Sequence, residues 1–266
     1  TIISTLAWGL GYFGMPQVLV RFLGIRSAEE VRQSRIIAVV WVVISMVCAL
    51  CIGFIGRAML PTYFGTNAAA ENIFIVIAQM ILPAFMCGVV VSGILAASMS
   101  SASSYLLITG SSVAENIFRG IIKRDATDRQ VMIVSRITLA VVMIIGILIA
   151  LDENSVIFRV VSYAWAGLGA SFGPLVLCSL YWRRTNLPGA LAGMLGGAIT
   201  VVVWHNFIKP LGGVFGIYEL LPAFIISLVC IFVVSKLTAE PSQEIYDEFD
   251  HYTEARMDED VNPATA

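Results

Sequence analysis

Long apolar runs alternate with short charged segments along most of the chain. Each run reaches or exceeds the ~20 residues that an α-helix needs to cross the hydrocarbon core of a bilayer. The runs lie near residues 1–22, 36–59, 84–118, 130–151, 156–182, 188–208 and 213–236. This pattern predicts an all-α, polytopic membrane protein whose transmembrane domain covers residues 1–236 with seven spans.

Two further segments break this regular pattern. The stretch 69–83 is apolar but too short to cross a bilayer. We predict an external or re-entrant helix there, ended by Pro83, because proline disfavours continuation of a helix. Residues 237–266 hold half of the chain's 18 acidic residues and few large apolar side chains. They are predicted to form an acidic, solvated and mobile tail.

Composition agrees with a membrane protein. Apolar residues make up 58% of the chain and charged residues 13%, whereas a soluble domain carries roughly 25% charged residues. The mean hydropathy is +0.88. We therefore expect the lipid bilayer to be the main surrounding of this chain, and we expect no nucleic acid among its partners.

The basic residues predict the orientation of the spans. If the loop after the first span is cytoplasmic, 13 of the 16 basic residues lie on the cytoplasmic side. Only Arg57, Arg159 and Lys209 then lie on the other side. Because cytoplasmic loops carry an excess of Lys and Arg, this arrangement predicts a C-terminus in the cytoplasm.

Three glycines and a proline interrupt the first apolar run, which reads Trp8-Gly9-Leu10-Gly11-Tyr12-Phe13-Gly14-Met15-Pro16. Pro16 removes a backbone donor, and each glycine costs about 1 kcal/mol relative to alanine within a helix. Unwound backbone persists in a membrane only against protein or a polar cavity, and secondary transporters use such broken helices as substrate sites. Trp8 and Tyr12 are placed to cover a small amphipathic solute. A Pro-kinked packing helix with interfacial aromatic residues is the alternative.

A serine-rich block in the third span is the second candidate site. On a helix, Ala97, Ser100, Ser101 and Ser104 share one face. A small hard cation requires several oxygen ligands. Two adjacent hydroxyls and a backbone carbonyl one turn earlier would supply three of them. Helix packing is the alternative, because serine and small residues commonly join membrane helices.

Several weaker patterns have structural interpretations. Two series of small residues predict close helix packing: Gly169 with Gly173, and Gly189 with Gly193 and Gly197. Ser112-x-x-Glu115 fits a capping box, which would place Glu115 at a helix end. His205 lies near the end of a span and has no visible partner in the sequence, so we interpret it as an interfacial residue.

Three blocks of the sequence together resemble the sodium/solute symporter family, and within it the bacterial sodium/proline symporters. The blocks occur in the family's order, and the resemblance covers nearly the whole chain except the acidic tail. They are Ala7-Trp8-Gly9-Leu10-Gly11-Tyr12-Phe13-Gly14 with Pro16 and Arg21-Phe22, Ile94-Leu95-Ala96-Ala97-Ser98-Met99-Ser100-Ser101, and Ser162-Tyr163-Ala164-Trp165-Ala166-Gly167-Leu168-Gly169-Ala170 with Gly173-Pro174.

The resemblance implies a leucine-transporter-type fold of two inverted five-helix repeats. This chain would supply the second repeat and two further transmembrane helices. The implied activity is sodium-coupled import of proline by alternating access across a bacterial cytoplasmic membrane. The protein would then be no enzyme and would need no cofactor, with sodium as the coupling ion. The alternatives are another small solute, such as pantothenate or a sugar, and the membrane input module of a sensor protein.

The resemblance also implies the roles of individual residues. The sodium ligands would be the carbonyl of Ala97 and the hydroxyls of Ser100 and Ser101. The substrate-binding residues would be Trp8, Tyr12 and Pro16. The other ligands would come from an upstream N-terminal segment, which we expect to be required for function. Thr1 opens directly into apolar sequence without the features of a signal peptide, as expected for the C-terminal portion of a transporter.

Overall fold

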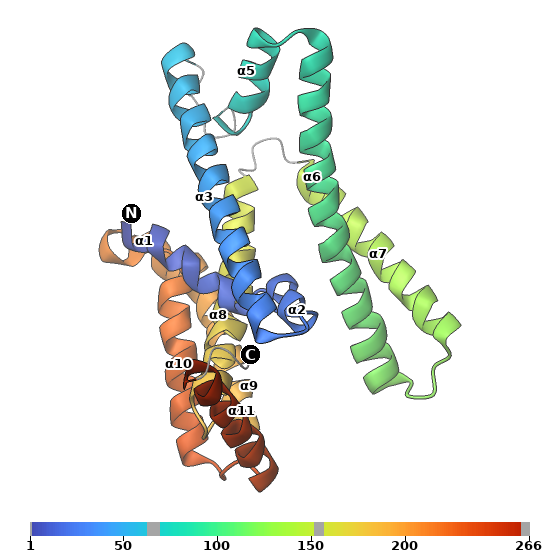
Figure 1. Ribbon diagram of the computed structural model, residues 1–266, viewed down its shortest axis with the longest axis vertical. Helices are drawn as coiled ribbons and strands as arrows, with labels where there is room; N and C mark the ends of the chain where they lie inside the picture. The colour runs from blue at the N-terminus through green and yellow to red at the C-terminus, as the bar shows by residue number, and fades with distance from the viewer. Residues whose placement is uncertain (1, 63–69, 152–156, 262–266) are drawn as a thin grey trace. The chain divides into compact units, whose positions relative to one another are not determined.

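The computed structural model describes residues 2–62, 70–151 and 157–261, and all regular structure in these residues is helical (Figure 1). This finding confirms the predicted all-α class. The first positions of the predicted segments that begin at 1, 69 and 156 lie outside the described residues, as does the end of the tail, 262–266.

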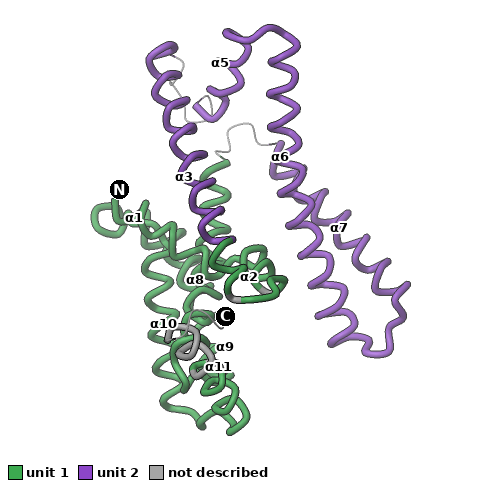
Figure 2. Tube along the Cα trace, viewed as in Figure 1, with its two compact units in different colours: residues 1–33, 157–266 green, residues 34–156 purple. Residues whose placement is uncertain are grey.

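The chain divides into two compact units, coloured separately in Figure 2. Unit 1 comprises residues 1–33 and 157–266, and unit 2 comprises residues 34–156. The two candidate sites therefore belong to different units. The interrupted first segment is part of unit 1, and the serine-rich block is part of unit 2.

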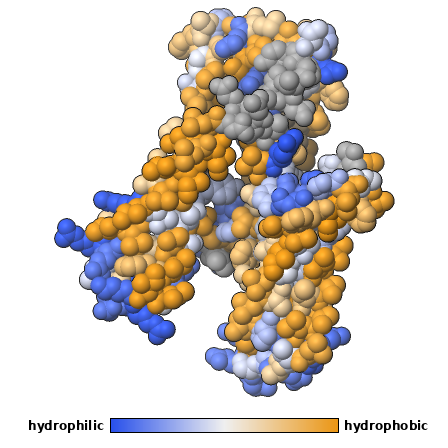
Figure 3. Space-filling view, turned by 180° about the vertical axis from the view of Figure 1, so that it is seen from behind, coloured by the Kyte–Doolittle hydropathy of each residue, from blue (hydrophilic) through white to orange (hydrophobic). Residues whose placement is uncertain are grey.

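Six helices in the described chain are long and apolar enough to cross a membrane. Their surfaces are covered largely by hydrophobic residues, and hydrophilic residues gather near helix ends (Figure 3). Apolar surfaces of this extent are stable only against lipid or further protein. The six are α3 (Ala28–Met59), α6 (Ala84–Ser111) with its continuation η3 (Ser112–Ile122), α7 (Asp128–Ala150), α8 (Ile157–Tyr181), α9 (Leu187–Val203) with the turns that follow it, and α10 (Leu220–Leu237). They establish a multi-pass membrane protein.

Close packing of α8, α9 and α10 forms the core of unit 1. Gly193 of α9 lies against the side chain of Ile231 in α10, and Gly197 lies against the carbonyl of Ala170 in α8. A Cβ atom at either glycine would overlap these neighbours, so the helices approach only because glycine has no side chain. The predicted packing role of this glycine series is confirmed.

Unit 2 contains α3 from residue 34 onward, α5 (Ile73–Ile81), α6, η3 and α7. The predicted short helix before Pro83 is confirmed over the bounds of α5. Leu82 is extended (φ −95°, ψ 144°), and Pro83 caps the start of α6. Near the other end of α6, Gly110 allows close contact with Ser135 and Leu139 of α7.

Three local predictions need correction or extension. The last span begins at Leu220 and not at 213, because Gly212 and Gly213 adopt positive φ values of 74° and 60° within short 3-10 turns. Ser112 does not cap a helix, because α6 continues without a break into the π-helix η3. The tail contains a helix that its composition did not predict, α11 (Gln243–Val261). The mobility and the cytoplasmic location of the tail stay predictions.

Candidate functional site

The predicted interruption of the first apolar segment is confirmed. Helix α1 (Ile2–Ala7) passes into a 3-10 segment, η1 (Trp8–Gly14), and helix α2 (Pro16–Leu23) begins after Met15. Met15 is extended (φ −85°, ψ 114°), and its N–H makes only a long bond of 3.4 Å to the Tyr12 carbonyl. Pro16 occupies the first turn of α2, where the missing N–H has no helical partner to lose.

Glycines bring η1 into direct contact with α8. A Cβ atom on Gly11 would overlap the indole of Trp165, and a Cβ atom on Gly169 would lie 2.6 Å from the Gly11 Cα. A Cβ atom on Gly14 would lie 2.6 Å from the carbonyl oxygen of Leu168. The glycines that interrupt the helix therefore also allow close packing, as the alternative interpretation of this segment predicted, and its role as a substrate site stays a prediction.

Trp165 of α8 contacts the interrupted segment through both its indole N–H and its aromatic ring. Its Nε1–H donates a hydrogen bond of 3.1 Å to the carbonyl of Trp8. Its ring meets the Tyr12 ring edge to face, with 4.9 Å between centroids. An unpaired carbonyl is costly in hydrocarbon, so a donor from another helix stabilises the interruption. Sequence reasoning missed this role, because residue spacing does not show that Trp165 packs against Gly11.

The two aromatic residues predicted to cover a solute have different surroundings. Trp8 is half-buried and stacks with Phe158, Trp165 and Tyr218 at centroid distances of 5.3, 5.5 and 5.8 Å. The side chain of Tyr12 is 52% exposed. Tyr12 therefore offers free aromatic surface to a ligand, whereas most of the Trp8 ring packs against its own unit.

The predicted sodium ligands Ala97, Ser100 and Ser101 are exposed on α6. Several neighbouring hydroxyls donate to the carbonyl four residues earlier at 2.8 to 3.1 Å, namely those of Ser98, Ser103 and Ser104. Within residues 70–151, no such bond is found for the hydroxyls of Ser100 and Ser101. Their oxygen atoms are therefore free to turn outward toward a ligand, which distinguishes them from the other serines of the block.

The interpretation of His205 as a residue without a partner is wrong. Its Nδ1 lies 2.9 Å from Oε1 of Glu219, and the other carboxylate oxygen accepts a 2.7 Å hydrogen bond from Lys209. Glu219, which directly precedes α10, is only 1% exposed. Burial opposes its ionisation, but hydrogen bonds from Lys209, from the backbone and from His205 together hold the pKa of Glu219 below its ordinary value.

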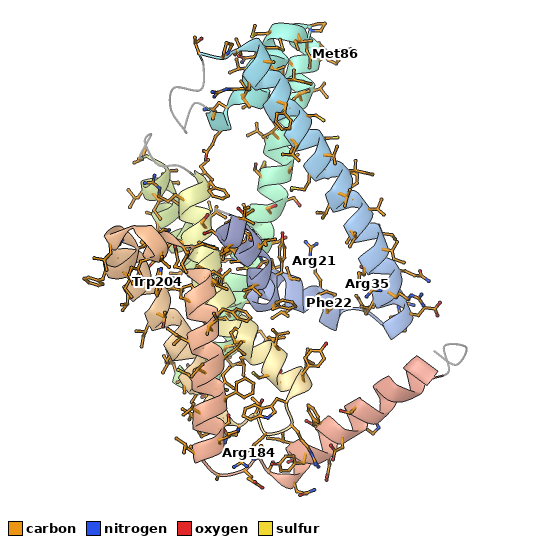
Figure 4. All side chains as sticks on the ribbon, turned by 90° about the vertical axis from the view of Figure 1, so that its left-hand side faces the viewer. Arg21, Phe22, Arg35, Met86, Arg184 and Trp204 are labelled. Atoms are coloured by element: carbon orange, nitrogen blue, oxygen red, sulfur yellow. The ribbon has the colours of Figure 1, made fainter. Side chains whose placement is uncertain are left out.

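This charged group depends on the turns that join α9 to α10. The π-helical segment η4 (Trp204–Ile208), the short 3-10 helices η5 (Lys209–Leu211) and η6 (Gly213–Gly216) and the residues after them return the chain to the end of α9. Trp204 marks this end of the α9–α10 pair, and Arg184 lies toward the opposite end (Figure 4). Sequence spacing does not reveal which residues such a turn brings together.

An interrupted helix held against a bundle of apolar helices is typical of one class of multi-pass membrane protein, the secondary transporters. Comparison with known families agrees with this class. The Sodium:solute symporter family matches residues 1–197. The chain therefore belongs to the sodium/solute symporter family, whose members are transporters.

Relatives in this family resemble most of the chain. It is 42% identical over 251 residues to the high-affinity proline transporter PutP of Bacillus subtilis, covering 94% of this chain and 52% of that protein. It is 39% identical to the osmoregulated proline transporter OpuE of the same organism, covering 94% of this chain and 50% of that protein. It is 41% identical to a sodium/proline symporter of Staphylococcus aureus, covering 90% of this chain and 48% of that protein. The chain thus spans about half the length of these relatives. No solved structure gives a significant match.

Proposed function

We propose that this chain belongs to a sodium-coupled importer of proline and contributes its interrupted substrate-binding helix and part of its sodium site. The observation that carries the proposal is the interruption at η1, which leaves Tyr12 exposed beside an irregular backbone segment. The names of the relatives, which are proline transporters and a sodium/proline symporter, support the choice of solute and coupling ion.

The substrate region comprises Trp8, Tyr12 and Pro16. The exposed ring of Tyr12 provides an apolar face against which the pyrrolidine ring of proline can pack. Pro16 begins α2, and the start of a helix carries partial positive charge that favours the carboxylate of an amino acid. Trp8 supports this surface through its stacking contact with Trp165.

Sodium is bound by the carbonyl of Ala97 and the hydroxyls of Ser100 and Ser101. Two features support this assignment: the three residues share one exposed face of α6, and both hydroxyls are without the back-bond of their neighbours. A hard cation needs more oxygen ligands than one helix supplies. The remaining ligands, and the other wall of the substrate site, come from transporter sequence outside these 266 residues.

The coupling follows from linkage between the two sites. Sodium binding favours the conformation that binds proline, and proline binding favours retention of sodium by the same factor. Alternation of this conformation between the two sides of the membrane lets an inward sodium gradient drive uptake. In this proposal the C-terminus lies in the cytoplasm of a bacterial cell, as the distribution of basic residues predicts.

Uptake of radiolabelled proline tests the proposal. The full-length transporter is reconstituted into proteoliposomes and supplied with an inward gradient of sodium or of potassium. Sodium should drive accumulation and potassium should not. Excess unlabelled pantothenate or glucose should leave proline uptake unchanged, whereas competition by either would identify another solute. Equal uptake in the two gradients would exclude sodium coupling.

A further inference from the structure

Tyr218 connects the start of α10 to the interrupted helix. Its backbone N–H donates a 3.1 Å hydrogen bond to Oγ of Ser4 in α1. Its ring stacks on Trp8 with 5.8 Å between centroids, and its hydroxyl donates a 2.7 Å bond to the carbonyl of Ser162 in α8. Tyr218 is 8% exposed. A single buried residue therefore contacts α1, η1 and α8.

The next residue fixes the position of Tyr218. Glu219 is buried and holds Lys209 and His205 through its two carboxylate oxygens at 2.7 and 2.9 Å. The His205 ring in turn lies 4.6 Å from the ring of Tyr163 in α8. Because Tyr218 and Glu219 are adjacent in the chain, these contacts also restrain the position of the Tyr218 Cα atom.

The two ends of η1 are held in different ways. At the C-terminal end, Gly14 packs against the backbone of α8, so movement toward α8 is blocked by steric contact. At the N-terminal end, the large side chains of α1 are exposed, including Ile2, Ile3 and Leu6. The contacts of Tyr218 with Ser4 and Trp8 lie at this end, together with the bond from Trp165 to the Trp8 carbonyl.

We propose that Tyr218 is a positioning residue for the substrate-binding segment, holding the Trp8 end of η1 so that Tyr12 is presented to the solute. This proposal rests on the proposed role of η1. Tyr218 acts through Trp8 and does not itself touch the solute. A residue that only stabilised the fold would change the amount of folded protein without changing the concentration of proline needed for half-maximal uptake.

The first experiment measures that concentration in the full-length transporter. Tyr218→Ala removes the stacking contact and the hydroxyl bond, so the half-saturating proline concentration should rise about tenfold. Tyr218→Phe keeps the ring and should raise it only about threefold. Half-saturation by sodium and the amount of protein in the membrane should change less. An unchanged proline value in a folded Tyr218→Ala variant would overturn the proposal.

Phe215 provides the matched control. Its ring belongs to the same connection between α9 and α10 but contacts Trp204, with 6.2 Å between centroids. Phe215→Ala should therefore leave the half-saturating proline concentration unchanged within experimental error. If Tyr218→Ala fails to fold, Ser4→Ala decides the question, because it removes only the acceptor of the Tyr218 N–H and should still raise the value. No rise in Ser4→Ala would then count against the proposal.

A second measurement does not depend on transport. Tyr12→Cys is introduced after the native cysteines are replaced by alanine, and its rate of reaction with a membrane-permeant maleimide is followed. Adding Tyr218→Ala should change this rate at least about threefold, because η1 loses its fixed position. Identical rates would overturn the proposal. If the parent transporter shows no sodium-driven proline uptake, the proposed function fails, and this rate still decides the role of Tyr218. The replaced cysteines are Cys48, Cys51, Cys87, Cys178 and Cys230.

Discussion

A single methyl group on Gly14 tests whether η1 depends on contact with α8. In Gly14→Ala the new Cβ would lie 2.6 Å from the carbonyl oxygen of Leu168, 2.8 Å from the backbone nitrogen of Gly173 and 2.9 Å from the Cα of Gly169. All three are backbone atoms of α8, so no side-chain rotation can relieve the overlap. The segment η1 must instead move away from the helix.

The size of the effect follows from that displacement. Carbon and carbonyl oxygen atoms normally approach to about 3.3–3.6 Å, so the two segments must separate by about 0.7 Å or more. Overpacking of this kind costs about 1–3 kcal/mol, and a rigid backbone neighbour places Gly14→Ala near the upper value. The same displacement would stretch the 3.1 Å bond from Trp165 to the Trp8 carbonyl, adding about 1 kcal/mol.

Thermal unfolding of the purified transporter in detergent measures the loss. A total cost of about 4 kcal/mol should lower Tm by roughly 8–16 °C for a unit of this size. Gly9→Ala is the control, because nothing lies within 4 Å of the Cβ that it would add. We expect its Tm to stay within about 2 °C of the parent. A Gly14→Ala variant as stable as Gly9→Ala would show that η1 does not depend on this contact.

Three further predictions concern the two candidate sites and the charged turn. Ser100→Ala and Ser101→Ala should each raise the sodium concentration for half-maximal uptake at least about tenfold, whereas Ser103→Ala, whose hydroxyl donates to the Met99 carbonyl, should change it less than about twofold. Tyr12→Ala should raise the half-saturating proline concentration in the same uptake assay about tenfold, with little change in sodium dependence. Glu219→Gln should lower Tm near pH 7, and its difference from the parent should shrink as the pH falls below 4.5, the ordinary pKa of the carboxyl.

The sign of the last prediction follows from the lowered pKa of Glu219. Its ion pair with Lys209 stabilises the folded state fully at pH values above the ordinary pKa of the carboxyl. This stabilisation is lost as the pH falls and the carboxyl becomes protonated in the folded protein. A difference in Tm that persisted down to pH 3 would contradict it. Sodium dependence equal to that of the parent in both serine variants would favour the packing interpretation of the serine-rich block. An unchanged half-saturating proline concentration in Tyr12→Ala would remove Tyr12 from the substrate site.

The sequence was sufficient to predict the long apolar helices and the interruption of the first apolar segment. Apolar runs long enough to cross a bilayer have few alternatives to a helix, because every backbone group must find a partner within the segment. The concentration of Gly9, Gly11, Gly14 and Pro16 predicted the interruption, since these residues weaken a helix when they lie in its interior. Both predictions depend on local chemistry, which the residues themselves contain.

The contacts that hold the interruption could not be predicted in the same way. The charged group at Glu219 joins residues from η4, η5 and the start of α10, and the return of the chain depends on the positive φ of Gly212 and Gly213. Apolar residues of that connection, such as Val214 and Phe215, look like part of a span by hydropathy alone. The difference between Ser100 and Ser103 is likewise invisible in sequence, because it depends on rotamers.

The contact between Gly11 and Gly169 restricts how this transporter can change during evolution. A Cβ atom on Gly169 would lie 2.6 Å from the Cα of Gly11, and no substitution of Gly11 can make room for it because glycine is already the smallest residue. A mutation of Gly169 therefore has no compensating mutation at Gly11. The lineage could tolerate such a mutation only by moving η1 away from α8, and that movement would weaken the bond between Trp165 and the Trp8 carbonyl. Substitutions of Gly169 should consequently be eliminated, even in populations where the surrounding apolar residues exchange freely.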